Sequence, residues 1–113
     1  MFLFNRNNGY ENIDMKNYIE KFANQKSDHV LVDVRSANEY SQGHIPTAIN
    51  IPLNMLDNRS NEIPNGKHVI VVCASGNRSR TGASKLINAG FKEVSNLKGG
   101  TMGWMMAGLS VER

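Results

Sequence analysis

The chain has 113 residues, of which 40% are hydrophobic, and it carries a formal net charge of +3 at pH 7. This length and composition fit one globular domain and exclude a wholly disordered chain. The basic residues are scattered along the sequence, so nucleic-acid binding is not predicted, and the mild positive charge indicates weak attraction to anions.

Residues 1–9 are predicted to form an N-terminal tail and residues 10–113 a single domain. The apolar residues Phe2, Leu3 and Phe4 are too few for a signal-peptide core, and no apolar run reaches membrane-spanning length. The single cysteine allows no internal disulfide. We therefore expect a cytoplasmic protein with no membrane partner.

The first half of the domain alternates helical and strand patterns. Asp14 is a predicted N-cap for a helix over residues 15–23, whose apolar side chains recur at helical spacing. The β-branched segment 29–34 follows, typical of a buried parallel strand. Ser36 and Glu39 form a capping-box pattern for a helix that ends near Gly43. A short strand over residues 48–51 comes next.

The second half repeats the alternation. The apolar segment 68–73 is the clearest strand of the sequence, and a helix that ends at Gly90 follows it. Residues 93–97 predict a last strand, and Gly99 and Gly100 lead into a closing helix around Trp104. The methionines of that helix are expected to pack in the core; they are Met102, Met105 and Met106.

The alternating pattern predicts an α/β fold with a mostly parallel sheet and helices on both faces. Ligands of such sheets bind beyond the carboxyl ends of the strands, where the winding reverses. Cys73, the only cysteine, stands at one of these ends.

The loop "CASGNRS" after this strand offers an unbroken run of backbone N–H groups. Gly76 permits a left-handed turn, so the loop from Ala74 to Ser79 is able to curl its donors around one point. A helix that begins near Arg78 or Ser79 adds its positive end. Such surroundings stabilise a thiolate and would make Cys73 a nucleophile. Spacing alone leaves open the alternative that Cys73 is an inert core thiol.

Three segments together resemble the rhodanese family, the thiosulfate sulfurtransferase-like proteins. They are "LVDVRSANEYSQGHIPTAINIPL", "VVCASGNRS" and "NLKGGTMGW", and they occur in the family's order over residues 10–111. The resemblance implies a five-stranded, mostly parallel sheet. It also implies that Cys73 accepts a sulfane sulfur as a persulfide and passes it to a thiophilic acceptor. No cofactor is expected.

The candidate substrate-binding residues are those of the loop, namely Ala74, Ser75, Gly76, Asn77, Arg78 and Ser79. Arg78 either faces a bound anion or braces the loop against a carboxylate such as Asp33. Asp33 and Arg35 close the strand 29–34 and are predicted to support the site. His44 fits a turn-stabilising role better than that of a catalytic base. No metal site is predicted, because the histidines and Cys73 lack ligand-like spacing.

Two other functions remain as alternatives. A cysteine-dependent phosphatase or arsenate reductase also holds a thiolate in an anion-binding loop, but phosphatase loops have five residues between the cysteine and the arginine. Here four intervene between Cys73 and Arg78. The second alternative is a non-catalytic rhodanese-like binding module. For the sulfurtransferase, the expected partners are a small sulfur-containing anion or persulfide as donor and an external thiol or protein as acceptor.

Overall fold

The computed structural model describes residues 9–23 and 28–113. Most of the predicted tail, including Phe2, Leu3 and Phe4, lies outside the described residues. The strands are β1 (Glu11–Ile13), β2 (His29–Asp33), β3 (Ile49–Asn50), β4 (His68–Val72) and β5 (Val94–Leu97). The α-helices are α1 (Met15–Tyr18), α2 (Ala37–Gln42), α3 (Leu56–Arg59), α4 (Asn77–Asn88) and α5 (Gly100–Met106).

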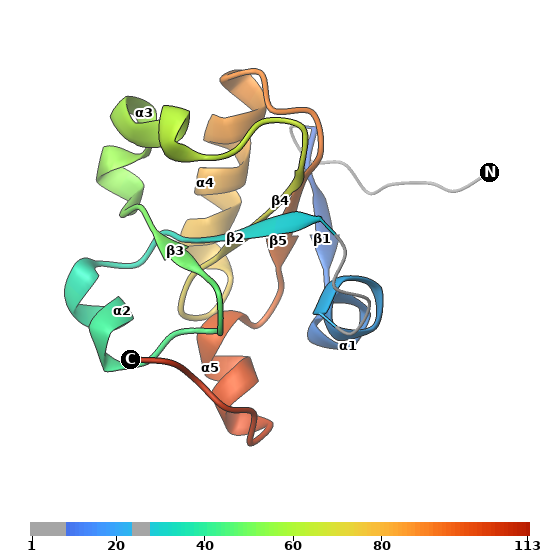
Figure 1. Cartoon of the computed structure of the whole chain (residues 1–113), viewed down its shortest axis with the longest axis vertical. Helices are drawn as coiled ribbons and strands as arrows, with labels where there is room; N and C mark the ends of the chain where they lie inside the picture. Colours follow the sequence, from blue (N-terminus) through green and yellow to red (C-terminus); the bar gives the residue numbers. More distant parts are fainter. Residues whose placement is uncertain (1–8, 24–27) are drawn as a thin grey trace.

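The strands form one sheet in the order β1-β5-β4-β2-β3, in which every pair is parallel (Figure 1). The predicted α/β fold is therefore confirmed. β4 is the central strand, between β5 and β2, and its five residues pair with all five of β2. The carboxyl end of β4 is thus held from both sides.

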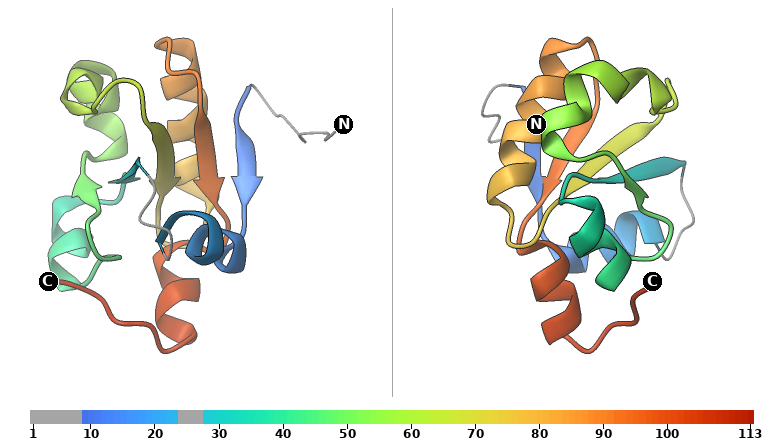
Figure 2. Two further views of the ribbon diagram at one scale, coloured as in Figure 1. Left: turned by 45° about the vertical axis from the view of Figure 1, so that its right-hand side comes forward. Right: turned by 90° about the vertical axis from the view of Figure 1, so that its left-hand side faces the viewer.

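Two hydrophobic cores lie on the two faces of the sheet. Val69 and Val71 of β4 pack with residues of α3 and α4, whereas Ile70 and Val72 pack with residues of α1 and α5. All four of these β4 side chains are buried. Figure 2 shows α1 and α4 on opposite sides of the strands. A central strand buried on both faces explains the unbroken β-branched run in its sequence.

Two segments of regular structure were not predicted from the sequence. β1 is a three-residue edge strand that pairs with β5, too short and too polar for a recognisable alternation. Residues 53–62 form a 3₁₀ turn, α3 and a second 3₁₀ turn. The helix predicted over 15–23 is α-helical only in α1 and continues as a π-helix over Ile19–Ala23. None of the helices among the described residues is both long and apolar enough to cross a membrane.

The methionines of α5 do not pack in the core, so this prediction was wrong. Met102, Met105 and Met106 are all exposed, Met106 at 84% of its surface. α5 buries Gly100, Thr101 and Trp104 instead. Thr101 and Trp104 are three residues apart and share one helical face, which leaves the methionines on the other.

The start of α5 is packed directly against the backbone that follows β4. Thr101 donates its N–H to the carbonyl of Cys73, and Met102 donates to that of Ala74, both at 2.9 Å. Gly100 has φ +56°, and a Cβ at this position would lie 2.3 Å from the oxygen of Cys73 and 2.6 Å from that of Ala74. Only glycine permits this close contact, which fixes the backbone on both sides of the Cys73 carbonyl.

We expect Gly100→Ala to lower the free energy of unfolding by about 3 kcal/mol, because the new methyl group meets two backbone oxygens and the backbone is left-handed. Gly103→Ala is the matched control in the same helix, since nothing lies within 4 Å of its added Cβ. It should be neutral or stabilise by up to about 1 kcal/mol. Urea unfolding measures both, and equal effects of the two substitutions would contradict this explanation.

Candidate functional site

Cys73 lies where the winding of the sheet reverses. The chain runs from β2 outward to β3 and from β4 outward in the other direction to β5. The segments that leave β2 and β4 therefore diverge, and Cys73 follows directly on β4 at this point. This is the place where parallel α/β sheets bind ligands.

The Cys73 side chain is buried, with 1% of the residue exposed. Its Sγ accepts a hydrogen bond from the backbone N–H of Gly76 at 3.1 Å. The Sγ also lies 3.3 Å from the hydroxyl of Ser79, to which the thiol donates. Ser79 in turn donates to Oδ1 of Asn96, a buried residue of β5 that the sequence did not single out. The sulfur is thus held by polar groups within a buried site.

These contacts shift the protonation equilibrium of Cys73. Burial on its own raises the pKa of the thiol, because it disfavours the charged form. The Ser79 hydroxyl and the backbone N–H groups of Ser79, Gly76 and Ser75 act in the opposite direction, and together they outweigh burial. The pKa of Cys73 therefore lies below its ordinary value, which favours the thiolate.

The predicted loop is the segment that positions these donors. Gly76 has φ +108° and stands directly before α4, which begins at Asn77, one or two residues earlier than expected. Its left-handed backbone aims its N–H at the sulfur, while the Ala74 carbonyl accepts a hydrogen bond from α5. The N-terminus of the 12-residue α4 adds a positive partial charge next to the same loop.

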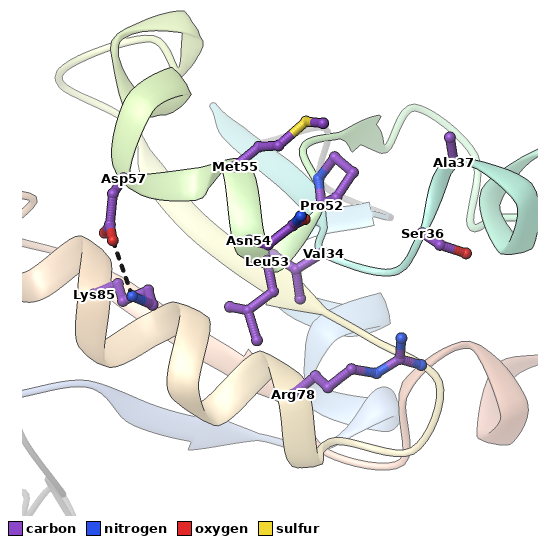
Figure 3. Close-up of a pocket in the computed structure, with 10 residues that line it drawn as sticks. All are labelled: Val34, Ser36, Ala37, Pro52, Leu53, Asn54, Met55, Asp57, Arg78 and Lys85. Carbon is purple, nitrogen blue, oxygen red and sulfur yellow. Dashed lines mark hydrogen bonds and ion pairs between the residues drawn. The ribbon is translucent and has the colours of Figure 1, made fainter.

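Arg78 braces the loop, but its partner is not Asp33. Its two terminal nitrogens donate to the two carboxylate oxygens of Glu39 in α2, at 2.8 and 2.9 Å. Figure 3 shows Arg78 reaching from the start of α4 toward the segment of Ser36 and Ala37. Glu39 is fixed by the predicted capping box, in which its Oε1 accepts from the Ser36 N–H at 3.0 Å. The capping pattern was recognisable in the sequence. The pairing of the Glu39 carboxylate with Arg78 was not.

Asp33 pairs with Arg35, two residues further along the chain. Its carboxylate is fully buried and accepts hydrogen bonds from Nε and Nη2 of Arg35, the latter at 2.8 Å. Arg35 also donates to the carbonyl of Gly43 at 2.8 Å, so it ties the start of α2 to its end. Arg35 thus pairs with Asp33 and not with Glu39. No hydrogen bond joins Asp33 or Arg35 to Cys73 within the described part of the chain, and their support of the site stays a prediction.

His44 occupies the turn after α2. Its ring stacks on that of Tyr40, with centroids 3.7 Å apart, and its Nδ1 lies 2.8 Å from the Tyr40 carbonyl oxygen. These contacts fit the predicted turn-stabilising role.

Two cavities flank the loop. The larger one, about 560 Å³, has apolar walls that include Val34 and Leu53 and is bordered by Arg78 (Figure 3). The smaller one, about 200 Å³, lies against Ser75, Gly76 and Asn77 on the side of β5 and β1. Its remaining walls are polar or basic and include Arg80 and Lys98. Within the described part of the chain, no cluster of three His, Cys, Asp or Glu residues could hold a metal ion.

The Arg78–Glu39 pair predicts a pH-dependent stability. Hydrogen bonds from Arg78 and from the Ser36 backbone lower the pKa of Glu39 from 4.5 to about 2. A depressed carboxyl pKa stabilises the fold above pH 4.5 and loses this effect as the pH falls toward 2. Because both side chains are about 40% exposed, we expect Glu39→Gln to cost less than about 1 kcal/mol at pH 7.

The same substitution should cost much less near pH 2, where about half of the wild-type carboxylate is protonated. Urea unfolding at both pH values measures this, and Arg78→Gln with the double variant isolates the pair. A cost of Glu39→Gln that is equal at both pH values would contradict the assignment.

Comparisons with known proteins identify the family of the chain. The family model described as rhodanese-like domain matches residues 14–107. A sulfurtransferase of Allochromatium vinosum is 35% identical over 99 residues, which cover 88% of this chain and 92% of that protein. Thiosulfate sulfurtransferase GlpE of Coxiella burnetii is 36% identical over 80 residues, which cover 71% and 75%.

A solved structure agrees with this result. The crystal structure of a rhodanese-related protein from Thermoplasma volcanium superposes with a TM-score of 0.80 at 30% identity, and covers 91% of this chain and 98% of its own. The resemblance carried by the three sequence segments is therefore confirmed, and the chain belongs to the rhodanese-like domain family.

Proposed function

We propose that the protein is a sulfurtransferase that carries a sulfane sulfur as a persulfide on Cys73. The observation that carries the proposal is the polar setting of the buried sulfur, in which Sγ accepts from the Gly76 N–H and the thiol donates to the Ser79 hydroxyl. The Ser79 hydroxyl and the neighbouring backbone N–H groups keep the pKa of Cys73 below its ordinary value in spite of burial. The names of the Allochromatium and Coxiella relatives support the same activity.

The reaction begins with the Cys73 thiolate, which attacks the outer sulfur of a donor such as thiosulfate. A new S–S bond forms on Sγ, the S–S bond of thiosulfate breaks, and sulfite leaves with the electron pair. The persulfide has the same charge as the thiolate, with the negative charge on the added sulfur. The remaining N–H groups of the loop and the positive end of α4 are the groups that would stabilise it. An acceptor then attacks the terminal sulfur and regenerates the thiolate.

The surroundings of the loop favour an anionic donor. Arg78, Arg80 and Lys98 lie on the cavities beside the loop. Arg80 and Lys98 form no ion pair with any other described residue, so their charges are available to attract anions. A low-molecular-weight persulfide with carboxylate groups would be attracted by the same positive charges. The acceptor thiol comes from another molecule, because Cys73 is the only cysteine of the chain.

The length of the loop argues against phosphatase chemistry. Four residues separate Cys73 from Arg78, and Arg78 is turned aside to Glu39. A loop of this size encloses a single sulfur atom more closely than a tetrahedral phosphate. A non-catalytic module would not require the donors that stabilise the thiolate.

We predict that the purified chain produces thiocyanate from thiosulfate and cyanide, with ping-pong kinetics, because the sulfur is carried covalently between two half-reactions. Cys73→Ser should abolish turnover, since a hydroxyl at this position is not ionised at neutral pH. Inserting one residue between Cys73 and Arg78 should slow turnover by displacing the N–H donors. An aryl phosphate should not be hydrolysed above the rate of the Cys73→Ser variant, and hydrolysis that depends on Cys73 would favour the phosphatase alternative.

A further inference from the structure

A chain of hydrogen-bonded side chains leads from the buried sulfur to the surface. The Cys73 thiol donates to the Ser79 hydroxyl at 3.3 Å, and Ser79 donates to Oδ1 of Asn96. Nδ2 of Asn96 then donates to Oδ1 of Asn12 at 2.9 Å. Asn12 and Asn96 are direct register partners in β1 and β5. All four side chains therefore form one connected row, which ends at Asn12 on the wall of the smaller cavity.

The Ser79 hydroxyl has one proton and two neighbours that compete for it. In the arrangement of the structure, this proton goes to Asn96, so Ser79 only accepts from the thiol. A Cys73 thiolate has no proton to donate and is stabilised by Ser79 only if the hydroxyl turns toward the sulfur. Ser79 then no longer donates to the Asn96 oxygen. Ser79 and Asn96 are both almost completely buried, and a buried polar group that loses its donor is costly.

Rotation of the two amide groups resolves this conflict without any further proton transfer. After a half-turn, Nδ2 of Asn96 donates to Ser79 and its Oδ1 faces Asn12. A half-turn of Asn12 then supplies a donor to Asn96 and directs its own oxygen into the cavity. Arg80 and Lys98 lie on the wall of this cavity, and cations there favour an oxygen in that position. Every hydrogen bond of the row is kept, but in the opposite direction.

We propose that Asn96, supported by Asn12, is a positioning residue that sets the direction of the Ser79 hydroxyl, and that the row reverses when the Cys73 thiolate forms. The inference rests on the proposed function only in taking the thiolate as the reactive form of Cys73. In this proposal the edge strand β1 also contributes to the site, because its pairing with β5 places Asn12 beside Asn96.

The test is Asn12→Asp in the full chain. A carboxylate only accepts hydrogen bonds, so it holds Nδ2 of Asn96 toward residue 12 and Oδ1 toward Ser79. The row is then locked in the direction that suits the thiol. We expect the Cys73 pKa to rise by about half a unit or more, so that alkylation by iodoacetamide at a pH below that pKa slows about threefold. The dependence of the alkylation rate on pH gives the pKa without any sulfur donor.

The direct electrostatic effect of the new charge requires its own control. Asn77→Asp places the same charge on the wall of the same cavity but outside the row. In 1 M salt, where the screening length is about 3 Å, the shift from Asn77→Asp should largely disappear and that from Asn12→Asp should remain. The other charged groups around Cys73 stay unchanged in these variants, namely Arg78, Glu39, Asp33, Arg35, Arg80 and Lys98.

Two further variants decide between a directional row and simple packing. In a Ser79→Ala background, Asn12→Asp should no longer shift the Cys73 pKa in high salt, because the link to the sulfur is missing. Asn96→Leu removes the competing acceptor and frees the Ser79 hydroxyl, so it should lower the pKa of Cys73. Thermal unfolding confirms that each variant is folded.

Equal screening of the two aspartate variants, or a shift that survives in the Ser79→Ala background, would overturn the proposal. If Asn96→Leu does not fold, Asn12→Asp at the edge strand still decides the question. Loss of sulfur transfer with an intact alkylation pattern would count against the proposed function and not against the row. Normal sulfur transfer without the expected alkylation pattern would count against the row and not against the proposed function.

Discussion

The chemistry of this protein depends on a competition at one sulfur atom between burial and hydrogen bonding. Burial of Cys73 disfavours the thiolate, whereas the hydroxyl of Ser79 and three backbone N–H groups favour it more strongly. The burial comes with the place of Cys73 in the core cluster beside α3 and α4, whereas the hydrogen-bonding groups belong to the loop and to the start of α4. A thiolate formed in this way is shielded from bulk solvent and stabilised by hydrogen bonds, which suits the sulfur-carrying role that we propose for Cys73.

The fold supplies the rigidity that this arrangement needs. The central strand β4 is paired along its whole length with β2, and its end is held against α5 by hydrogen bonds to the carbonyls of Cys73 and Ala74. The close approach of Gly100 leaves no space for a side chain there. On the other side, the Arg78–Glu39 pair links α4 to α2. The loop is therefore fixed at its first residues by backbone packing and at its last residues by an ion pair.

The sequence was most informative where local patterns decide the structure. The strand before Cys73, the capping box of Ser36 and Glu39, and the need for glycine at position 76 all follow from neighbouring residues. Pairings between distant segments were harder to predict. Asp33 was one candidate carboxylate for Arg78, but Arg35 two residues away already occupies it, and Arg78 pairs with Glu39. Asn12 and Asn96 are 84 residues apart and meet only because β1 joins the sheet, and a three-residue polar strand has no recognisable period. The exposed methionines of α5 could be placed only once the buried face of that helix was known.

We propose that Cys73 holds a sulfur atom between two half-reactions, and the mass of the intact chain shows whether it does. The protein is incubated with thiosulfate, separated from the donor and weighed, and its peptides are then mapped. We expect a gain of one sulfur atom, located on Cys73 and removed by cyanide as thiocyanate. The same experiment with a low-molecular-weight persulfide covers the other class of donor. An unchanged mass after both donors, together with a thiol that resists alkylation at neutral pH, would contradict the account and favour a non-catalytic rhodanese-like module.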